Sequence, residues 1–171
     1  TTLPVAVLRS LGLSTALAER CFHAGCLVAF ALGVAALVLA LRPLCRLEAA
    51  TAGLIAMLNP FTISFLLPSN LFVMVVVAPW MMLVAFRGIT RDRQWKDAAA
   101  FALLVLVAGN GDTPGLVYAA LAAGLFVVLV VLVERASTWR QVVRWAAKAG
   151  ALSATTASWA FVKALHASDS L

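Results

Sequence analysis

The residues best placed to do chemistry are those of the segment Gly109-Asn110-Gly111-Asp112, a predicted turn that contains the carboxylate of Asp112. An aspartate can act as a base, or share a proton with a second aspartate, when another carboxyl group lies close by. The remaining aspartates, Asp92, Asp97 and Asp169, fall in predicted loops. The chain also lacks the HExxH, GxSxG, GxxxxGK[ST] and GxGxxG patterns of metal, serine and nucleotide sites. Catalysis of the kind seen in soluble enzymes is therefore not predicted.

The acidic turn has three interpretations. Its G-x-G-D string resembles the motif of presenilin-type intramembrane aspartyl proteases, which need a second aspartate that a partner chain would have to supply. Asp112 and Thr113 also precede Pro114, a favoured first helical residue, so their oxygens can cap the next helix. An aspartate near a water-filled cavity of a membrane protein is, finally, a candidate for ligand contact.

Polar residues predicted to lie on the same side of the membrane as Asp112 are candidates for binding a substrate or a lipid. The alternative is that they only form turns. These weak candidates are Asp112, Asn110, Asn70 and Ser69. No catalytic residue is predicted. No metal site is predicted either, because His23 and His166 lack partners at metal-ligand spacing. The cysteines are three in number and lack CxxC spacing, so no disulfide framework follows.

The composition is that of a protein in a bilayer. Of the 171 residues, 64% are apolar and 12% are charged, whereas soluble domains have about 45–50% and about 25%. A soluble domain of this size leaves roughly 30% of its unfolded surface in water, so it could not bury so many apolar side chains. The net charge of +6 arises from short clusters between apolar runs, which indicates membrane topology and not nucleic-acid binding.

We expect an all-α, polytopic bundle of about six membrane helices, forming one transmembrane domain over residues 1–171. Interfacial helices are expected in residues 1–20, with Gly12 ending the first and Ser14 capping the next. Membrane helices are expected in residues 21–165. The expected crossings are Cys21–Leu41, Leu47–Leu58, Leu71–Phe86, Trp95–Ala108, Leu116–Val133 and Ala149–Leu165.

The clearest crossing is Cys21–Leu41, whose 21 residues contain no charged side chain and span roughly 30 Å as a helix. A separate amphipathic helix is expected over Glu134–Lys148, where Arg140, Arg144 and Lys148 recur on one face. That face could attract anionic head groups. The five tryptophans, including Trp145, are expected to anchor the chain at membrane boundaries.

Orientation follows from the basic residues. Numbering the crossings in order puts residues 42–46, 87–96 and 134–148 on one side, and these stretches hold ten of the 13 Lys and Arg residues. Because basic loops face the cytoplasm, both ends of the chain and the turn at Asp112 are predicted to be extracytoplasmic. The predicted location is the plasma membrane.

Several strings in this order resemble the N-terminal membrane region of actinobacterial α-(1→3)-arabinofuranosyltransferases. They are LGLSTALAER, then AGLIAMLNPFTISFLLPSNLFVMVVVAPWMMLVAFRG, then WKDAAAFALLVLVAGNGDT, then WRQVVRWAAKAGALSATTASWAFVKAL, and they cover about Leu8 to Leu165. That family belongs to the GT-C superfamily of multispanning glycosyltransferases. Its members tend to carry Asn where this chain has Asp112, and the long soluble carbohydrate-binding portion that follows in the family has no counterpart here.

The resemblance implies a role in cell-envelope arabinan assembly, in which a sugar passes from a polyprenyl-phosphate donor to a glycan acceptor outside the membrane. The family's catalytic acid lies in the first extracytoplasmic loop, and no residue here matches it. The chain is therefore expected to be a fragment, a split subunit or an inactive relative, contributing scaffold and donor groove beside the remainder of a parent protein or other membrane subunits. Membrane lipids are the other expected partners.

The alternative is a non-catalytic membrane subunit or a small transporter in which Asp112 or Lys163 lines a path. Proton or solute flux in liposomes that disappears with Asp112→Asn would favour this alternative.

Cysteine labelling tests the predicted orientation. With the three native cysteines replaced, we expect Asn110→Cys in intact cells to react with an impermeant thiol reagent and Thr90→Cys to remain unlabelled. Labelling of both positions, or of Thr90→Cys alone, would contradict the predicted topology.

Overall fold

The structure is a computed structural model that describes residues 3–60, 62, 69–91, 94–109, 113–134 and 137–168. This part of the chain is helical apart from short turns, so the predicted all-α class is confirmed. The described elements are α1 (Leu3–Ser10), α2 (Thr15–Leu41), α3 (Arg46–Leu58), α5 (Ser69–Thr90), α6 (Gln94–Gly109), α7 (Thr113–Leu129), the π-helical turn η1 (Val130–Glu134) and α8 (Trp139–Ser168).

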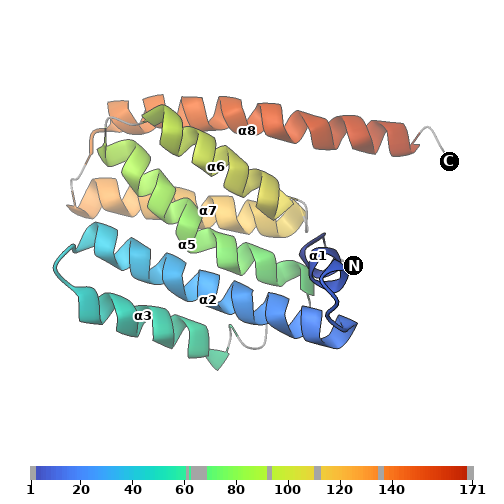
Figure 1. The fold of residues 1–171 in the computed structure, drawn as a ribbon. Helices are drawn as coiled ribbons and strands as arrows, with labels where there is room; N and C mark the ends of the chain where they lie inside the picture. The colour runs from blue at the N-terminus through green and yellow to red at the C-terminus, as the bar shows by residue number, and fades with distance from the viewer. Residues whose placement is uncertain are drawn as a thin grey trace.

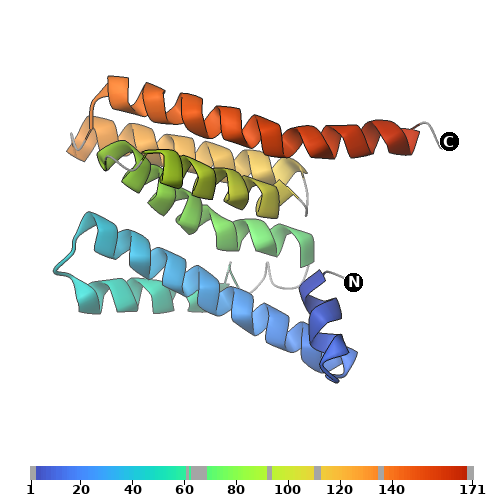
Figure 2. The ribbon, with the colours of Figure 1, turned by 45° about the horizontal axis from the view of Figure 1, so that its top comes forward.

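The helices form an elongated bundle with α5 at its centre (Figures 1 and 2). One side of α5 carries α2, which packs against α3 as an antiparallel hairpin, and the other side carries α6 and α7. The last helix, α8, packs mainly along α6 and also reaches α5. Because α5 contacts four other helices, it joins the two halves of the bundle.

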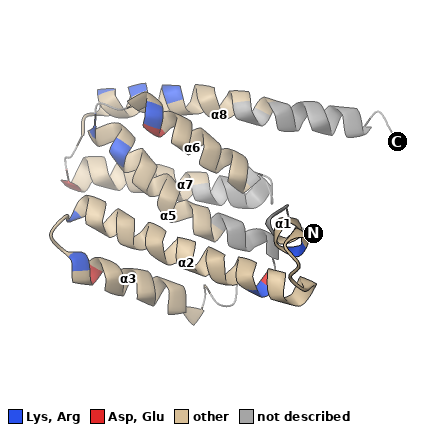
Figure 3. Cartoon of the chain, viewed as in Figure 1, with Lys and Arg blue, Asp and Glu red and all other residues tan. Residues whose placement is uncertain are grey.

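Helix direction alternates along the chain, so α2, α5 and α7 run one way and α3, α6 and α8 run the other (Figure 1). The end of the bundle where α2 and α5 finish and α6 and α8 begin is called the basic end below. Arg42, Arg46, Arg91 and Arg144 are among its basic residues, and Figure 3 shows most of the blue ribbon there. The basic stretches grouped by the sequence thus share one end of the bundle.

Among the described residues, one helix is long and apolar enough to cross a membrane, namely α2 with 27 residues. Only 6% of the most apolar 18-residue stretch of α2 is buried, whereas the core helix of a soluble protein is mostly buried. Val75–Thr90 and Ala120–Glu134 are apolar but shorter. The 13 residues of α3 extend only about 20 Å, so the predicted crossing Leu47–Leu58 is too short to span a bilayer core of about 30 Å alone.

The two helix ends predicted near the N-terminus are confirmed. Gly12 has φ of +91° just after α1, and the Ser14 side chain accepts a hydrogen bond from the Leu17 N–H at 3.4 Å. The helix that begins at Thr15 then continues to Leu41 without a break. No helix end therefore separates residues 15–20 from the expected crossing Cys21–Leu41, and the charged Glu19 and Arg20 lie in the exposed first turns of the same helix.

The C-terminal region also forms one helix where two were predicted. α8 runs from Trp139 to Ser168, whereas the sequence suggested an amphipathic helix over Glu134–Lys148 and a separate crossing. A capping box fixes its start: the Thr138 N–H donates to Gln141 Oε1 at 3.1 Å, and the Gln141 N–H donates to Thr138 Oγ1 at 3.4 Å. Glu134 instead ends η1.

Glycines let neighbouring helices approach closely on the α2 side. A Cβ atom on Gly53 of α3 would lie 2.6 Å from the Ala31 carbonyl oxygen of α2. A Cβ atom on Gly33 would lie 2.7 Å from the Trp80 indole nitrogen. That indole donates a hydrogen bond of 3.0 Å to the Ala29 carbonyl oxygen. The bond links α2 to α5 at the residue that follows Pro79, the proline inside α5.

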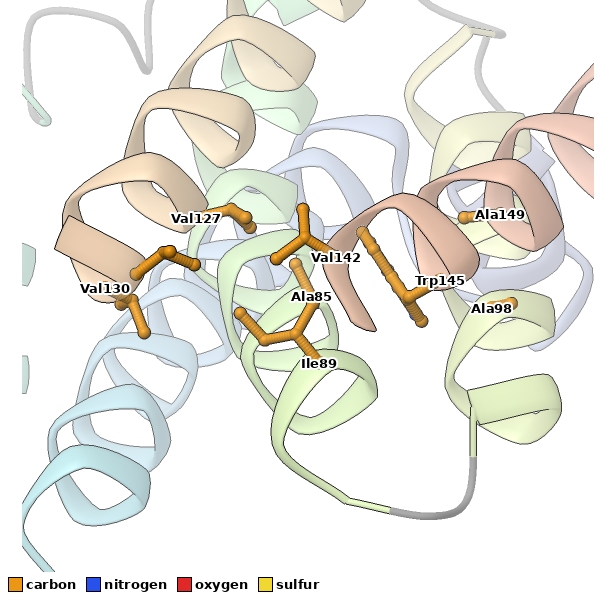
Figure 4. Packing of buried hydrophobic residues seen from close by; sticks show 9 residues of the cluster. Ala85, Ile89, Ala98, Val127, Val130, Val142, Trp145 and Ala149 are labelled. Atoms are coloured by element: carbon orange, nitrogen blue, oxygen red, sulfur yellow. The ribbon is translucent and has the colours of Figure 1, made fainter. Parts of the chain in front are cut away.

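The other half of the bundle is held by a core of small and branched side chains around one indole (Figure 4). Ala85 and Ile89 of α5 meet Val142 and Trp145 of α8, and Val130 of η1 closes the cluster. Trp145 is 5% exposed, so its predicted role as a boundary anchor is wrong. The indole fits because α5 has Gly88 opposite it.

Replacing Gly88 by alanine should destabilise the protein. The new Cβ would overlap the Trp145 indole, and over-packing of this kind costs about 1–3 kcal/mol. Gly150→Ala is the matched control in α8, because a Cβ there meets nothing within 4 Å and alanine favours helix by up to about 1 kcal/mol. Thermal unfolding followed by circular dichroism should show a lower midpoint for Gly88→Ala alone. Equal midpoints for the two variants would contradict the packing described.

Candidate functional site

The structure describes the backbone of only some predicted site residues. Ser69 and Asn70 occupy the first turn of α5, and their side chains lie outside the described residues. Asn110 and Asp112 lie outside the described residues altogether. The start of α5, the end of α6 and the start of α7 lie at the same end of the bundle, opposite the basic end (Figure 1). The helix ends that carry or flank these four positions therefore share one end of the bundle.

An apolar groove between α7 and α8 is the clearest binding feature of the described residues. It has a volume of about 480 Å³, with α6 and Ala85 of α5 at its floor. Phe101 and Val105 line the floor, while Gly124 and Gly150 stand in the two walls. The lining residues are apolar except for Trp139, Trp145 and Ser153, and the Trp145 N–H and the Ser153 hydroxyl are buried away from the groove surface. Such a surface favours a hydrocarbon chain over a polar ligand.

Small residues create the space. The α7 wall has Ala120, Ala123 and Gly124 beside Val127 and Val128, and the α8 wall includes Ala146 and Gly150. A Cβ on either glycine meets nothing within 4 Å, so neither glycine is required for close helix packing. Where these small residues stand on the two helices, α7 and α8 leave part of the space between them unfilled.

An aromatic pair, Phe101 of α6 and Trp145 of α8, lines the groove. The Phe101 and Trp145 rings meet edge to face, with centroids 5.3 Å apart and planes at 83°. The Trp145 indole N–H is buried and has no hydrogen-bond acceptor, because its nitrogen edge lies against Gly88 of α5. Burying this donor without a partner has a free-energy cost, which the surrounding apolar contacts offset.

Charge lies away from the groove. Val142, Ala146 and Ala149 of α8 face the groove. Arg140 and Arg144 are each two residues from Val142 along the chain, so each lies about 200° from it around the helix. Both arginines are exposed. The groove and the basic residues of α8 are thus two separate surfaces on opposite faces of one helix.

The groove was not predicted from the sequence. Its signal was the enrichment in alanine and glycine at positions 119–124 and 146–151, which are interrupted only by Leu121 and Lys148. Small residues of this kind usually allow close helix contact, so the pattern alone does not indicate an open space. Only the arrangement of α7 and α8 on a shared floor distinguishes the two cases.

No protein-family model matches this chain, and neither a curated protein nor a solved structure gives a significant match.

Proposed function

We propose that the chain is the membrane scaffold of a polyprenyl-phosphate-dependent glycosyltransferase of the arabinofuranosyltransferase type, and that the groove between α7 and α8 holds the lipid chain of the donor. The observation that carries the proposal is the apolar groove of about 480 Å³, lined in part by the Phe101–Trp145 ring pair. An isoprenoid chain is narrow and wholly apolar, and burying it stabilises the complex by about 25 cal/mol per Å² of apolar area.

The outer surface supports a membrane location for the bundle. Leu32 of α2, Leu54 of α3 and Leu121 and Leu125 of α7 are each more than half exposed. Exposed apolar surface spread over several helices is unfavourable in water and favourable against lipid tails. We infer that α2, α5, α6, α7 and α8 cross the bilayer with α3 as a shorter companion of α2, in a multi-pass arrangement.

The charge distribution supports the orientation. Arg42, Arg91 and Arg144 belong to the basic end, which by the positive-inside rule faces the cytoplasm. The opposite end, with the flanks of Asn110 and Asp112, then faces outward, where a polyprenyl-phosphate sugar would meet its glycan acceptor. In this proposal the catalytic carboxylate belongs to another part of the assembly, and the role of this chain is to bind and position the lipid.

Photo-crosslinking tests the groove. A polyprenyl phosphate with a diazirine on its isoprenoid chain should label residues of α7 and α8 that line the groove, read by mass spectrometry of the detergent-purified protein. Gly150→Leu fills the groove and should lower the affinity about tenfold, which corresponds to about 1.4 kcal/mol. Gly25→Leu is the control, because Gly25 of α2 also has nothing within 4 Å of an added Cβ but lies outside the groove.

Two results would contradict this assignment. One is labelling spread evenly over α2 and α3, and the other is unchanged labelling in Gly150→Leu. The sugar-transfer part is tested separately, by linkage analysis of the envelope glycan after depletion of the protein from its native cells. Loss of arabinofuranosyl linkages is expected, and an unchanged glycan would contradict the transferase assignment while leaving lipid binding intact.

A further inference from the structure

We propose that a second lipid site lies at the basic end, where Arg140, Arg144 and Lys148 of α8 and Trp95 of α6 bind the phosphate head group of an anionic phospholipid. These four residues are called the α8 basic surface below. The proposal rests on the membrane placement given under the proposed function, but not on sugar transfer or on the groove.

Lys148 is held in place by neutral groups. Its Nζ donates a hydrogen bond of 2.8 Å to Gln94 Oε1 and lies 5.1 Å from the centroid of the Trp95 ring. An ammonium group has three donors, and neither neighbour carries a compensating negative charge. The lysine is thus oriented by α6 while its charge stays available to an anion.

Arg140 and Arg144 extend this positive surface. They stand four residues apart on consecutive turns of α8, so their side chains share a face with Lys148. Both are exposed, so their guanidinium groups can be reached from outside the bundle. Guanidinium groups bind phosphate oxygens in a bidentate manner, which suits a phosphodiester or phosphomonoester head group.

Apolar side chains beside the arginines indicate an amphiphile and not a free anion. Val143, next to Arg144 in the chain, is 64% exposed, and Trp95, beside Lys148, is 62% exposed. A tryptophan whose ring is half exposed beside cations suits the head-group level of a bilayer. Inorganic phosphate would leave these side chains uncovered, whereas the glycerol and upper acyl region of a phospholipid would cover them.

The test compares anionic and neutral lipids on the same protein. Native mass spectrometry of the detergent-purified chain, titrated with phosphatidylglycerol or with phosphatidylcholine of the same acyl chains, gives an apparent Kd for each lipid. We expect phosphatidylglycerol to bind at least fivefold more tightly. Arg140→Gln/Arg144→Gln should abolish this preference, because it removes two exposed charges that make no contact needed for folding. The matched control Arg9→Gln/Arg20→Gln removes two exposed charges from the opposite end and should change the preference less than twofold.

A single substitution checks the contribution of the held lysine. Lys148→Gln should weaken phosphatidylglycerol binding severalfold, and thermal unfolding confirms that the variant is folded.

The proposal is overturned if the wild type shows no preference for phosphatidylglycerol, if both double variants lose the preference equally, or if millimolar inorganic phosphate displaces the lipid. Crosslinking of polyprenyl phosphate in the groove should be unchanged in Arg140→Gln/Arg144→Gln, so failure at one site leaves the other testable.

Discussion

The contact of the Trp145 indole with Gly88 fixes where the last helix can lie. Without a side chain at Gly88, the ring reaches the α5 backbone and α8 is held over α6 and α5. α7 is held on α5 independently, so α7 and α8 share a floor while their small residues face one another. The groove follows from this arrangement. The buried indole N–H without an acceptor shows that shape, and not hydrogen bonding, determines the position.

Local signals were sufficient for much of the fold. Gly12, Ser14 and Pro114 mark helix ends through backbone preferences that depend on a few neighbouring residues, and the described boundaries of α1, α2 and α7 agree with them. The start of α8 carried an equally local signal in Thr138 and Gln141, but the charged stretch before it obscured the boundary. It was harder to predict that α2 and α8 are each one unbroken helix, because the hydropathy of the sequence changes within each helix at a point where the helix does not end.

The features that matter most for function depend on contacts between distant residues. Trp145 has the composition of a boundary anchor, and its burial depends on a glycine 57 positions earlier in the sequence. The groove likewise depends on which helices lie beside one another. The candidate polar positions Asn110 and Asp112 lie outside the described residues.

The hairpin of α2 and α3 is held by contacts between residues that are close in the sequence. Its close crossing at Gly53 and Ala31 joins residues 22 positions apart, whereas the Trp145 cluster needs α5, η1 and α8 together. Local contacts form earlier than distant ones, and chains are synthesised from the N-terminus. The hairpin can therefore assemble while the ribosome is still translating the second half, and α5 then serves as the template on which the last three helices collect.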